Sequence, residues 1–327
     1  MKSTRKCLEQ GIASVRKTLT RWLLAALLLA CNALILLPAG GQQLEKPDSM
    51  QSFSVGSYPW GLTFDGANIW VTSYFNDNVT KLRASDGTLL GTFPAGGGTA
   101  FATFDGENVW FTNQENDTVT KLRASDGSLQ GTFAIGDAPG NILFDGTNIW
   151  LAGFYSGALY KIRPSDGQVI AVFPVTGNPS GLTFDGANVW VTNGGEFAHA
   201  VTKLRADGTV LGSVSVESEP QGIAFDGVNI WVGFYFGDTV TKLRARNGAL
   251  LGTFTVGSGP REVASGDGYI WVANSNDGTV MRLRPNDGSI EHTYTGLSYP
   301  GGMVFDGINM WVSNAHNNTV TKISRNH

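Results

Sequence analysis

Histidines and carboxylates, the side chains most used in acid–base and metal chemistry, form no recognised motif in this 327-residue sequence. Three histidines precede the C-terminal one: His199, His292 and His316. There is no HExxH, no Gly-x-Ser-x-Gly, no phosphate loop and no Cys/His spacing. Carboxylates expected on one rim of the fold could offer Ca²⁺ the oxygen ligands it prefers, with solvated acids as the alternative: Glu115, Glu196, Glu217, Glu219 and Glu262. We therefore assign no catalytic residue and no metal ligand.

A second group of residues has types suited to binding rather than to catalysis. Aromatic rings beside polar side chains are typical of ligand and protein contacts when they are exposed together. The alternative is that some rings only fill the mouth of a channel. The candidate ligand-binding residues are Trp60, Tyr74, Phe101, Phe154, Tyr155, Phe197, His199, Gln221, Tyr235, Arg261 and Glu262.

The elements that must position these residues come from an internal repeat of about 40 residues. A Phe-Asp-Gly-x-Asn-x-Trp pattern recurs, with its tryptophan at spacings of 40, 40, 40, 41, 40 and 40 residues. The seven tryptophans are Trp70, Trp110, Trp150, Trp190, Trp231, Trp271 and Trp311. Repetition this regular predicts seven copies of one structural unit.

Each repeat reads as four short strands. In the first copy they are expected at 62–64, 69–72, 79–83 and 88–95, with Asp-Gly turns after the first and third strands. Period-two alternation of apolar and β-branched residues, interrupted by Asp-Gly pairs, is the signal of strands and hairpins. Four strands per 40 residues make a propeller blade. The sequence therefore predicts an all-β protein, a seven-bladed β-propeller of four-stranded blades.

The two ends of the repeat array complement each other. Residues 53–56 match the fourth-strand sequence 254–257, whereas the chain ends after a third strand at 319–324. We therefore expect the N-terminal strand to complete the last blade, which closes the ring and removes an open sheet edge.

Two repeated side chains are expected to be architectural. One tryptophan per blade on the second strand should pack blade against blade. A cation also recurs in every blade, and we interpret it as a snorkelling stem with a repeated partner. The cations are Lys81, Lys121, Lys161, Lys203, Lys242, Arg282 and Lys322.

Function is expected where the copies differ. Two of the four connections per blade are nearly identical in all copies and share one face, and the other two diverge on the opposite face. Loops on a rigid scaffold often carry function, although drift of unconstrained loops is the alternative. The position after the loop proline should ring the central channel: Trp60, Ala100, Gly140, Ser180, Gln221, Arg261 and Gly301. The next position holds Phe101, Asn141 and Glu262 where the other blades have glycine.

The loops between second and third strands add further rings to this rim. Its aromatics are Tyr74, Phe75, Phe154, Tyr155, Phe234, Tyr235 and Phe236, and a longer loop in blade four adds Glu196, Phe197 and His199. His316 of blade seven should lie across the ring from His199, so the two would not share a metal ion. His292, on a fourth strand, is expected at the surface. Blade six departs from the pattern at 265–269, which we interpret as a local packing change.

The N-terminal 41 residues are expected to be a signal peptide or membrane anchor, followed by a linker at 42–49 and the propeller at 50–327. Six basic residues precede an apolar run of about 18 residues. Leu28-Leu29-Ala30-Cys31 also resembles a lipobox, so a lipoprotein with a lipid on Cys31 is a further alternative. Cys7 and Cys31 are the only cysteines, which leaves the propeller without disulfides. We expect an extracytoplasmic protein (periplasmic, secreted or attached to the cell envelope) that contacts a membrane only through this segment.

Charge argues against one class of partner. Beyond residue 41 the chain has 17 basic and 26 acidic residues, a net charge of −9. A negative surface does not attract phosphate backbones, so nucleic acid is not an expected partner.

The repeat resembles those of YVTN/NHL-type propellers and of the streptogramin (virginiamycin B) lyase group. The resemblance rests on residues 55–72 and 78–82 and their copies, and it covers 50–324. It implies a seven-bladed propeller and, for the lyases, Mg²⁺-dependent catalysis by a histidine directly after the loop proline and a glutamate on a nearby rim loop. Here Arg261 and Gly301 occupy the matching histidine positions, and the loop after Trp311 has no glutamate.

We therefore predict a monomeric, exported, non-enzymatic binding module that engages a protein, peptide or glycan through the divergent rim. The alternative is a metal-dependent lyase or hydrolase acting at the channel mouth with Mg²⁺ or Ca²⁺. A purely structural envelope protein is a third interpretation.

Overall fold

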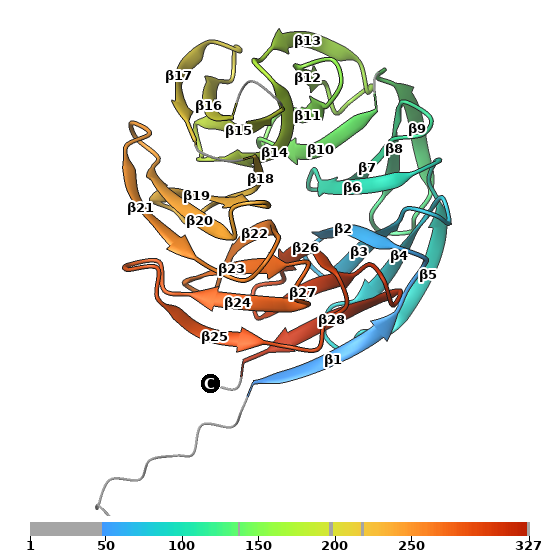
Figure 1. Cartoon of the computed structure of the whole chain (residues 1–327). Coiled ribbons are helices and arrows are strands. Elements are labelled where there is room, and N and C mark those ends of the chain that lie inside the picture. Colours follow the sequence, from blue (N-terminus) through green and yellow to red (C-terminus); the bar gives the residue numbers. More distant parts are fainter. Residues whose placement is uncertain (1–47, 137, 196–198, 217–218, 326–327) are drawn as a thin grey trace, which may run out of the picture. The chain divides into compact units, whose positions relative to one another are not determined.

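The structure, a computed structural model, describes residues 48–136, 138–195, 199–216 and 219–325. They form seven four-stranded antiparallel sheets arranged around a central channel, which confirms the predicted seven-bladed β-propeller (Figure 1). No helix among these residues is long and apolar enough to cross a membrane.

The blades follow the chain in order, with the first strand of each nearest the channel (Figure 1). Blade one is β2 (Pro59–Phe64), β3 (Asn68–Ser73), β4 (Asn78–Arg83) and β5 (Leu89–Pro94). Blade two is β6 (Thr99–Phe104), β7 (Asn108–Asn113), β8 (Thr118–Arg123) and β9 (Leu129–Ala134). Blade three is β10 (Pro139–Phe144), β11 (Ile149–Gly153), β12 (Ala158–Ile162) and β13 (Val169–Pro174). Blade four is β14 (Asn178–Phe184), β15 (Asn188–Gly194), β16 (Ala200–Arg205) and β17 (Val210–Ser215).

The remaining blades repeat the same order. Blade five is β18 (Pro220–Phe225), β19 (Asn229–Phe234), β20 (Thr239–Arg244) and β21 (Leu250–Thr255). Blade six is β22 (Pro260–Gly266), β23 (Tyr269–Asn274), β24 (Thr279–Leu283) and β25 (Ile290–Tyr294). Blade seven is β26 (Pro300–Phe305), β27 (Asn309–Asn314) and β28 (Thr319–Ser324), completed by β1 (Ser49–Ser54).

The ring closes as predicted. Strand β1 pairs antiparallel with β28, from Ser49 opposite Ser324 to Ser54 opposite Thr319. The first strand thus begins one residue before the expected boundary at 50. The expected signal or anchor at 1–41 and most of the expected linker lie outside the described residues.

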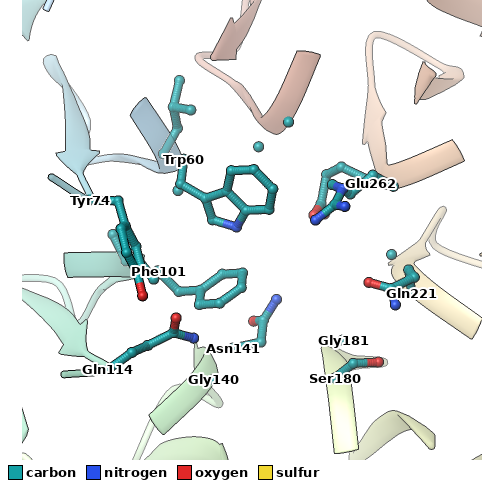
Figure 2. Close-up of a pocket in the computed structure, with 18 of the residues that line it drawn as sticks. Trp60, Tyr74, Phe101, Gln114, Gly140, Asn141, Ser180, Gly181, Gln221 and Glu262 are labelled. Atoms are coloured by element: carbon teal, nitrogen blue, oxygen red, sulfur yellow. The ribbon is translucent and has the colours of Figure 1, made fainter. Parts of the chain in front are cut away.

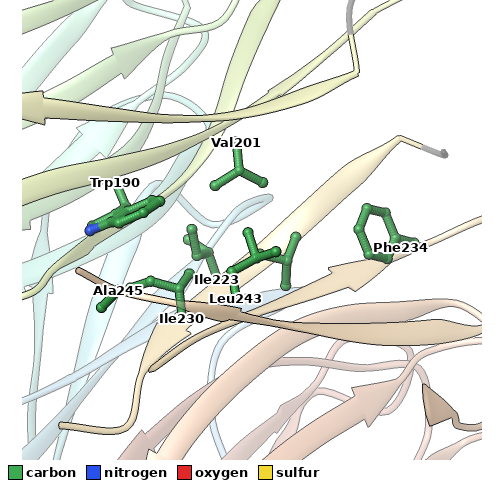
Figure 3. Packing of buried hydrophobic residues seen from close by; sticks show 8 residues of the cluster. Trp190, Val201, Ile223, Ile230, Phe234, Leu243 and Ala245 are labelled. Carbon is green, nitrogen blue, oxygen red and sulfur yellow. The ribbon is translucent and has the colours of Figure 1, made fainter. Parts of the chain in front are cut away.

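The core consists of seven apolar clusters, each built from two neighbouring blades. In one, Trp190 and Val201 of blade four pack on Ile223, Ile230 and Leu243 of blade five (Figure 3). All seven repeated tryptophans are at most 1% exposed, as the repeat predicts. Burying about 200 Å² per indole contributes up to about 5 kcal/mol at each interface.

The Asp-Gly turn does more than reverse the chain. In blade one, Asp65 accepts hydrogen bonds from the backbone N–H groups of Ala67 and Asn68, and its second oxygen accepts the indole N–H of Trp70 at 2.8 Å. The same aspartate–tryptophan bond recurs in five other blades at 2.6–2.8 Å. The repeated turn therefore satisfies the one polar atom of each buried indole.

The repeated cations also join neighbouring blades. The Lys81 ammonium lies 5.0 Å from the Trp70 ring centroid and donates to the carbonyl of Ala124 in the next blade. The other five lysines repeat both contacts. The predicted architectural role of the series is confirmed.

Blade six replaces this scheme with an ionic one. Arg282, 4% exposed, binds Asp48, Glu291 and the hydroxyl of Tyr294. The indole of Trp271 donates to the carbonyl of Gly266, because this glycine stands where the other blades have the aspartate. The departure at 265–269 thus accompanies a clasp between blade six and the start of the chain.

Candidate functional site

The site begins with a backbone irregularity at the inner strand of every blade. In blade one the strand ladder pairs Pro59 with Ser73 and resumes at Leu62 with Val71, which leaves two residues opposite Thr72. Such a bulge turns side chains out of the ladder and is common beside binding sites. Six blades leave two consecutive residues unpaired at this point of the ladder, whereas blade six leaves Arg261 alone unpaired. The bulges therefore aim the predicted ring positions into the channel.

Glycine at the second bulge position reflects close approach of the next blade. A Cβ atom on Gly61 would lie 2.5 Å from the carbonyl oxygen of Ala100, and one on Gly302 would lie 2.3 Å from that of Trp60. Gly181 and Gly222 face the same restriction. Three blades have a larger residue at this position and so add a second side chain to the channel: Phe101, Asn141 and Glu262.

Together these residues line a cavity of about 630 Å³ at the channel mouth (Figure 2). All seven ring positions line it, as the sequence predicts: Trp60, Ala100, Gly140, Ser180, Gln221, Arg261 and Gly301. Its volume suits a small molecule or one projecting group of a larger ligand.

One side of the mouth is a continuous aromatic arc. Tyr58 stacks on Trp60, with ring centroids 5.7 Å apart and planes at 6°, and it also contacts Tyr74 and Phe75. His316 stacks on Tyr299 at 4.3 Å and lies 6.1 Å from Tyr58. We call Tyr58, Trp60, Tyr74, Phe75, Tyr299 and His316 the aromatic arc.

Arg261 is held against this arc by its flat guanidinium group. The group lies 4.7 Å from the ring centroid of Trp60, 4.8 Å from that of Tyr235 and 5.4 Å from that of Tyr299. It also donates a hydrogen bond to the Tyr299 hydroxyl at 3.1 Å. Stacking on three rings fixes the plane of the cation at the cavity wall.

Glu262 stands directly after Arg261 in the sequence and lines the same cavity. Of the described residues, none donates a hydrogen bond to its carboxyl group or forms an ion pair with it. Burial raises the pKa of this carboxyl to about 8, and the nearby charge of Arg261 only partly opposes that rise.

Polar side chains around the cavity share this lack of internal partners. Among the described residues, none hydrogen-bonds to the Trp60 indole N–H, the Tyr74 hydroxyl or the side-chain amides of Gln114, Asn141 and Gln221. In Figure 2 the indole nitrogen of Trp60 and the ends of Asn141 and Gln221 lie around the open centre. The buried hydroxyls of Thr72 and Thr192, by contrast, are bonded within the protein.

The structure places the predicted site residues unevenly. Trp60, Tyr74, Phe101, Phe154, Gln221, Arg261 and Glu262 line the cavity. Tyr235 does not line it but stacks on Arg261. Tyr155 is 73% exposed, is not part of the lining and packs edge-on against Phe154. His199 is half-buried and is not part of the lining, and Phe197 lies outside the described residues.

The expected rim position of Phe234 is wrong. It ends β19 opposite Pro220 and is 4% exposed in the core between blades four and five. Its neighbours Tyr235 and Phe236 follow the strand, so the alternation of side chains along β19 sends Phe234 inward. His292 is exposed on β25, as predicted.

Sequence reasoning missed Tyr58 and Tyr299, which precede the loop prolines of blades one and seven. Both have left-handed backbone φ angles, 53° and 55°, where Gly98 and Gly259 stand in blades two and six. A non-glycine residue in this region is strained, and such strain clusters at functional sites. Tyrosine at a position where two other copies have glycine was the available signal.

The acids of the rim do not gather. Within the described part of the chain, no three His, Cys, Asp or Glu side chains are grouped to hold a metal ion. Glu196 and Glu217 lie outside it, so the Ca²⁺ or Mg²⁺ expectation stays a prediction.

The propeller is similar in fold to solved structures of streptogramin lyases. One is a catalytically inactive histidine-to-alanine variant of virginiamycin B lyase from Staphylococcus aureus with quinupristin (TM-score 0.74, 19% identity, 85% of this chain and 99% of that chain). Another is a streptogramin B lyase (TM-score 0.73, 18% identity, 85% of this chain and 98% of that chain). No protein-family profile and no curated protein sequence matches the chain. The chain thus has the seven-bladed propeller fold and resembles virginiamycin B lyase in architecture.

Proposed function

We propose that this protein is an exported, non-enzymatic binding module that holds a group of a protein, peptide or glycan ligand in the cavity at the channel mouth. The observation that carries the proposal is the set of cavity-lining polar side chains without internal partners, set between aromatic walls. Proteins satisfy buried polar groups internally unless water or a ligand does so. Export is supported by the basic, then apolar, N-terminal segment.

Peptide and glycan arrays probed with the purified protein test the proposal. The double variant Trp60→Ala/Phe101→Ala removes two aromatic rings from the cavity wall. We expect its affinity for the retained ligands to fall about 100-fold, because buried aromatic anchors dominate binding energy. Tyr155→Ala is the matched control, since this ring is exposed and off the cavity. Retention of the same ligands by the double variant would refute the cavity as the site.

The enzymatic alternative is a metal-dependent lyase or hydrolase acting in the same cavity. Similarity of fold to the streptogramin lyases favours it, although fold alone is a weak guide to activity. Incubation of the protein with quinupristin and Mg²⁺, followed by chromatography and tandem mass spectrometry, tests it. Conversion of quinupristin would overturn the non-enzymatic assignment, and an unchanged compound together with no thermal stabilisation by Mg²⁺ or Ca²⁺ would exclude this alternative.

A further inference from the structure

Arg261 places a positive charge at the cavity wall. No carboxylate of the described residues lies within 4.0 Å of the Arg261 guanidinium, and its buried Nε–H has no hydrogen-bond partner. Stacking on Trp60, Tyr235 and Tyr299 orients the cation but supplies no counter-charge. An arginine at a partly dry wall without an anion is an electrostatic cost that a ligand can relieve.

We propose that the cavity recognises a carboxylate group carried beside a ring or apolar face, with Arg261 as its cationic partner and Trp60 and Phe101 as the surfaces on which the ring packs. The inference rests on the proposed binding function and names the chemistry of the ligand. A peptide carboxyl terminus and a sugar acid both present this chemistry.

The cavity wall also carries uncharged hydrogen-bond donors, which suit an anionic ligand. The indole N–H of Trp60 and the amide groups of Asn141 and Gln221 lie around the open centre without internal partners (Figure 2). An indole N–H can only donate, and each amide carries two donor hydrogens. A carboxylate accepts several such bonds at once, whereas an ammonium group could use only the carbonyl oxygens of the amides and would leave the indole N–H unmatched.

Glu262 fits this chemistry because it is neutral at pH 7. Its pKa of about 8 means that the carboxyl group keeps its proton and donates a hydrogen bond instead of repelling an anion. The packed strands β18, β19 and β26 bring no ionisable side chain, and on β23 Tyr269 stands at the far end, opposite Gly266. Arg261 is thus the charged group that acts on Glu262.

Tyr235 and Tyr299 lie against Arg261, His316 stacks on Tyr299, and Glu115 lies against Gly98 of blade two. The hydrogen bond from Tyr299, opposed by burial and helped by Arg261, lowers the pKa of Tyr235, and burial raises that of Tyr299. Glu219, which precedes β18, lies against Gly194 of blade four. At neutral pH the wall around Glu262 therefore carries the positive charge of Arg261.

Three probes of similar shape separate charge from packing: phenylacetate, neutral phenylacetamide and phenethylammonium. Isothermal titration calorimetry at pH 7 should show phenylacetate binding at least about tenfold more tightly than phenylacetamide, and phenethylammonium binding most weakly. N-acetylphenylalaninate and glucuronate then distinguish a peptide-like from a sugar-acid source. Equal affinity for phenylacetate and phenylacetamide, or a preference for the ammonium probe, would overturn the inference.

Variants connect the preference to the two side chains. Arg261→Gln should remove the preference for phenylacetate, whereas Arg284→Gln, an exposed arginine on the opposite face, should leave it intact. Wild-type affinity for phenylacetate should fall about tenfold from pH 7 to pH 9, as Glu262 ionises. Glu262→Gln should bind phenylacetate like the wild type at pH 6 and show no such fall.

The two proposals fail separately. If Trp60→Ala/Phe101→Ala loses the array ligands but Arg261→Gln keeps the full preference for phenylacetate, the carboxylate inference is wrong and the binding site stands. If the array ligands ignore the Trp60→Ala/Phe101→Ala change, the proposed site itself is wrong.

Discussion

Arg261 of blade six lies over the indole of Trp60 of blade one, 4.7 Å from its ring centroid, although blade seven stands between the two blades in the ring. Blade seven has Gly301 at its ring position, and a Cβ atom there would lie 3.7 Å from the Trp60 ring. Blade seven thus places no side chain of its own at the ring position between Arg261 and Trp60.

Gly301→Val should therefore displace the Trp60 ring from Arg261 while the ring of blades stays folded. The added methyl groups would occupy the space beside the indole, and the backbone φ of Gly301 is not in the left-handed region. We expect the Arg261 side-chain N–H resonance to lose the ring-current shift caused by the indole, as it would in Trp60→Ala. An unchanged resonance would show that the indole does not depend on this glycine.

Gly302→Ala should destabilise the propeller much more than a similar change at a free strand position. The new Cβ atom would lie 2.3 Å from the carbonyl oxygen of Trp60, so blades seven and one must separate. We expect a loss of about 3 kcal/mol in urea unfolding, typical of overpacking against backbone. Gly212→Ala is the matched control because nothing lies within 4 Å of its added Cβ atom, and it should be nearly neutral.

Asp65→Ala should cost about 2 kcal/mol of unfolding free energy. The change leaves the buried indole N–H of Trp70 and two turn amides without their acceptor. Asp86→Ala, in an exposed turn of the same blade, serves as the control. Similar melting temperatures for the two variants would show that the indole bond contributes little.

Asp48→Asn should loosen the closure of the ring. Asp48 accepts hydrogen bonds from Arg282 at 2.9 Å and from the Tyr294 hydroxyl, which ties the chain just before β1 to blade six. Breaking a largely buried ion pair costs about 3 kcal/mol or more, although Asn keeps part of the hydrogen bonding. Hydrogen exchange should quicken in β1 and β28 but stay unchanged in blade three.

Glu262→Gln should stabilise the protein at high pH and not at low pH. The unfolded carboxyl group loses its proton near pH 4.5, whereas the folded one keeps it until about pH 8. The wild type therefore loses stability as the pH rises between these values. Allowing for solvent that reaches the carboxyl through the mouth, we expect the variant to gain about 3 kcal/mol at pH 8.5 relative to pH 5. Parallel pH profiles of unfolding free energy would contradict the raised pKa.

The sequence alone determined the blades, their order and their closure. The patterns that predict them are local and repeat in the chain: strand alternation, Asp-Gly turns and a tryptophan about every 40 residues. Because the pattern recurs, the strand assignment in one copy supports that in the others. The ring positions could be predicted for the same reason, since Trp60, Gln221 and Arg261 stand at one place in the repeat. Glu262 and Phe101 could be predicted because they stand at the following position, where four of the seven copies have glycine.

Only the tertiary structure decided how those positions meet. The stacking of Arg261 on Trp60, the unpaired state of Glu262 and the clasp of Arg282 on Asp48 join residues far apart in the chain. No repeat encodes such contacts, because each depends on what neighbouring blades leave empty. Phe234 was misplaced in the rim because the pattern names a position, whereas packing between blades four and five selects the direction of the side chain.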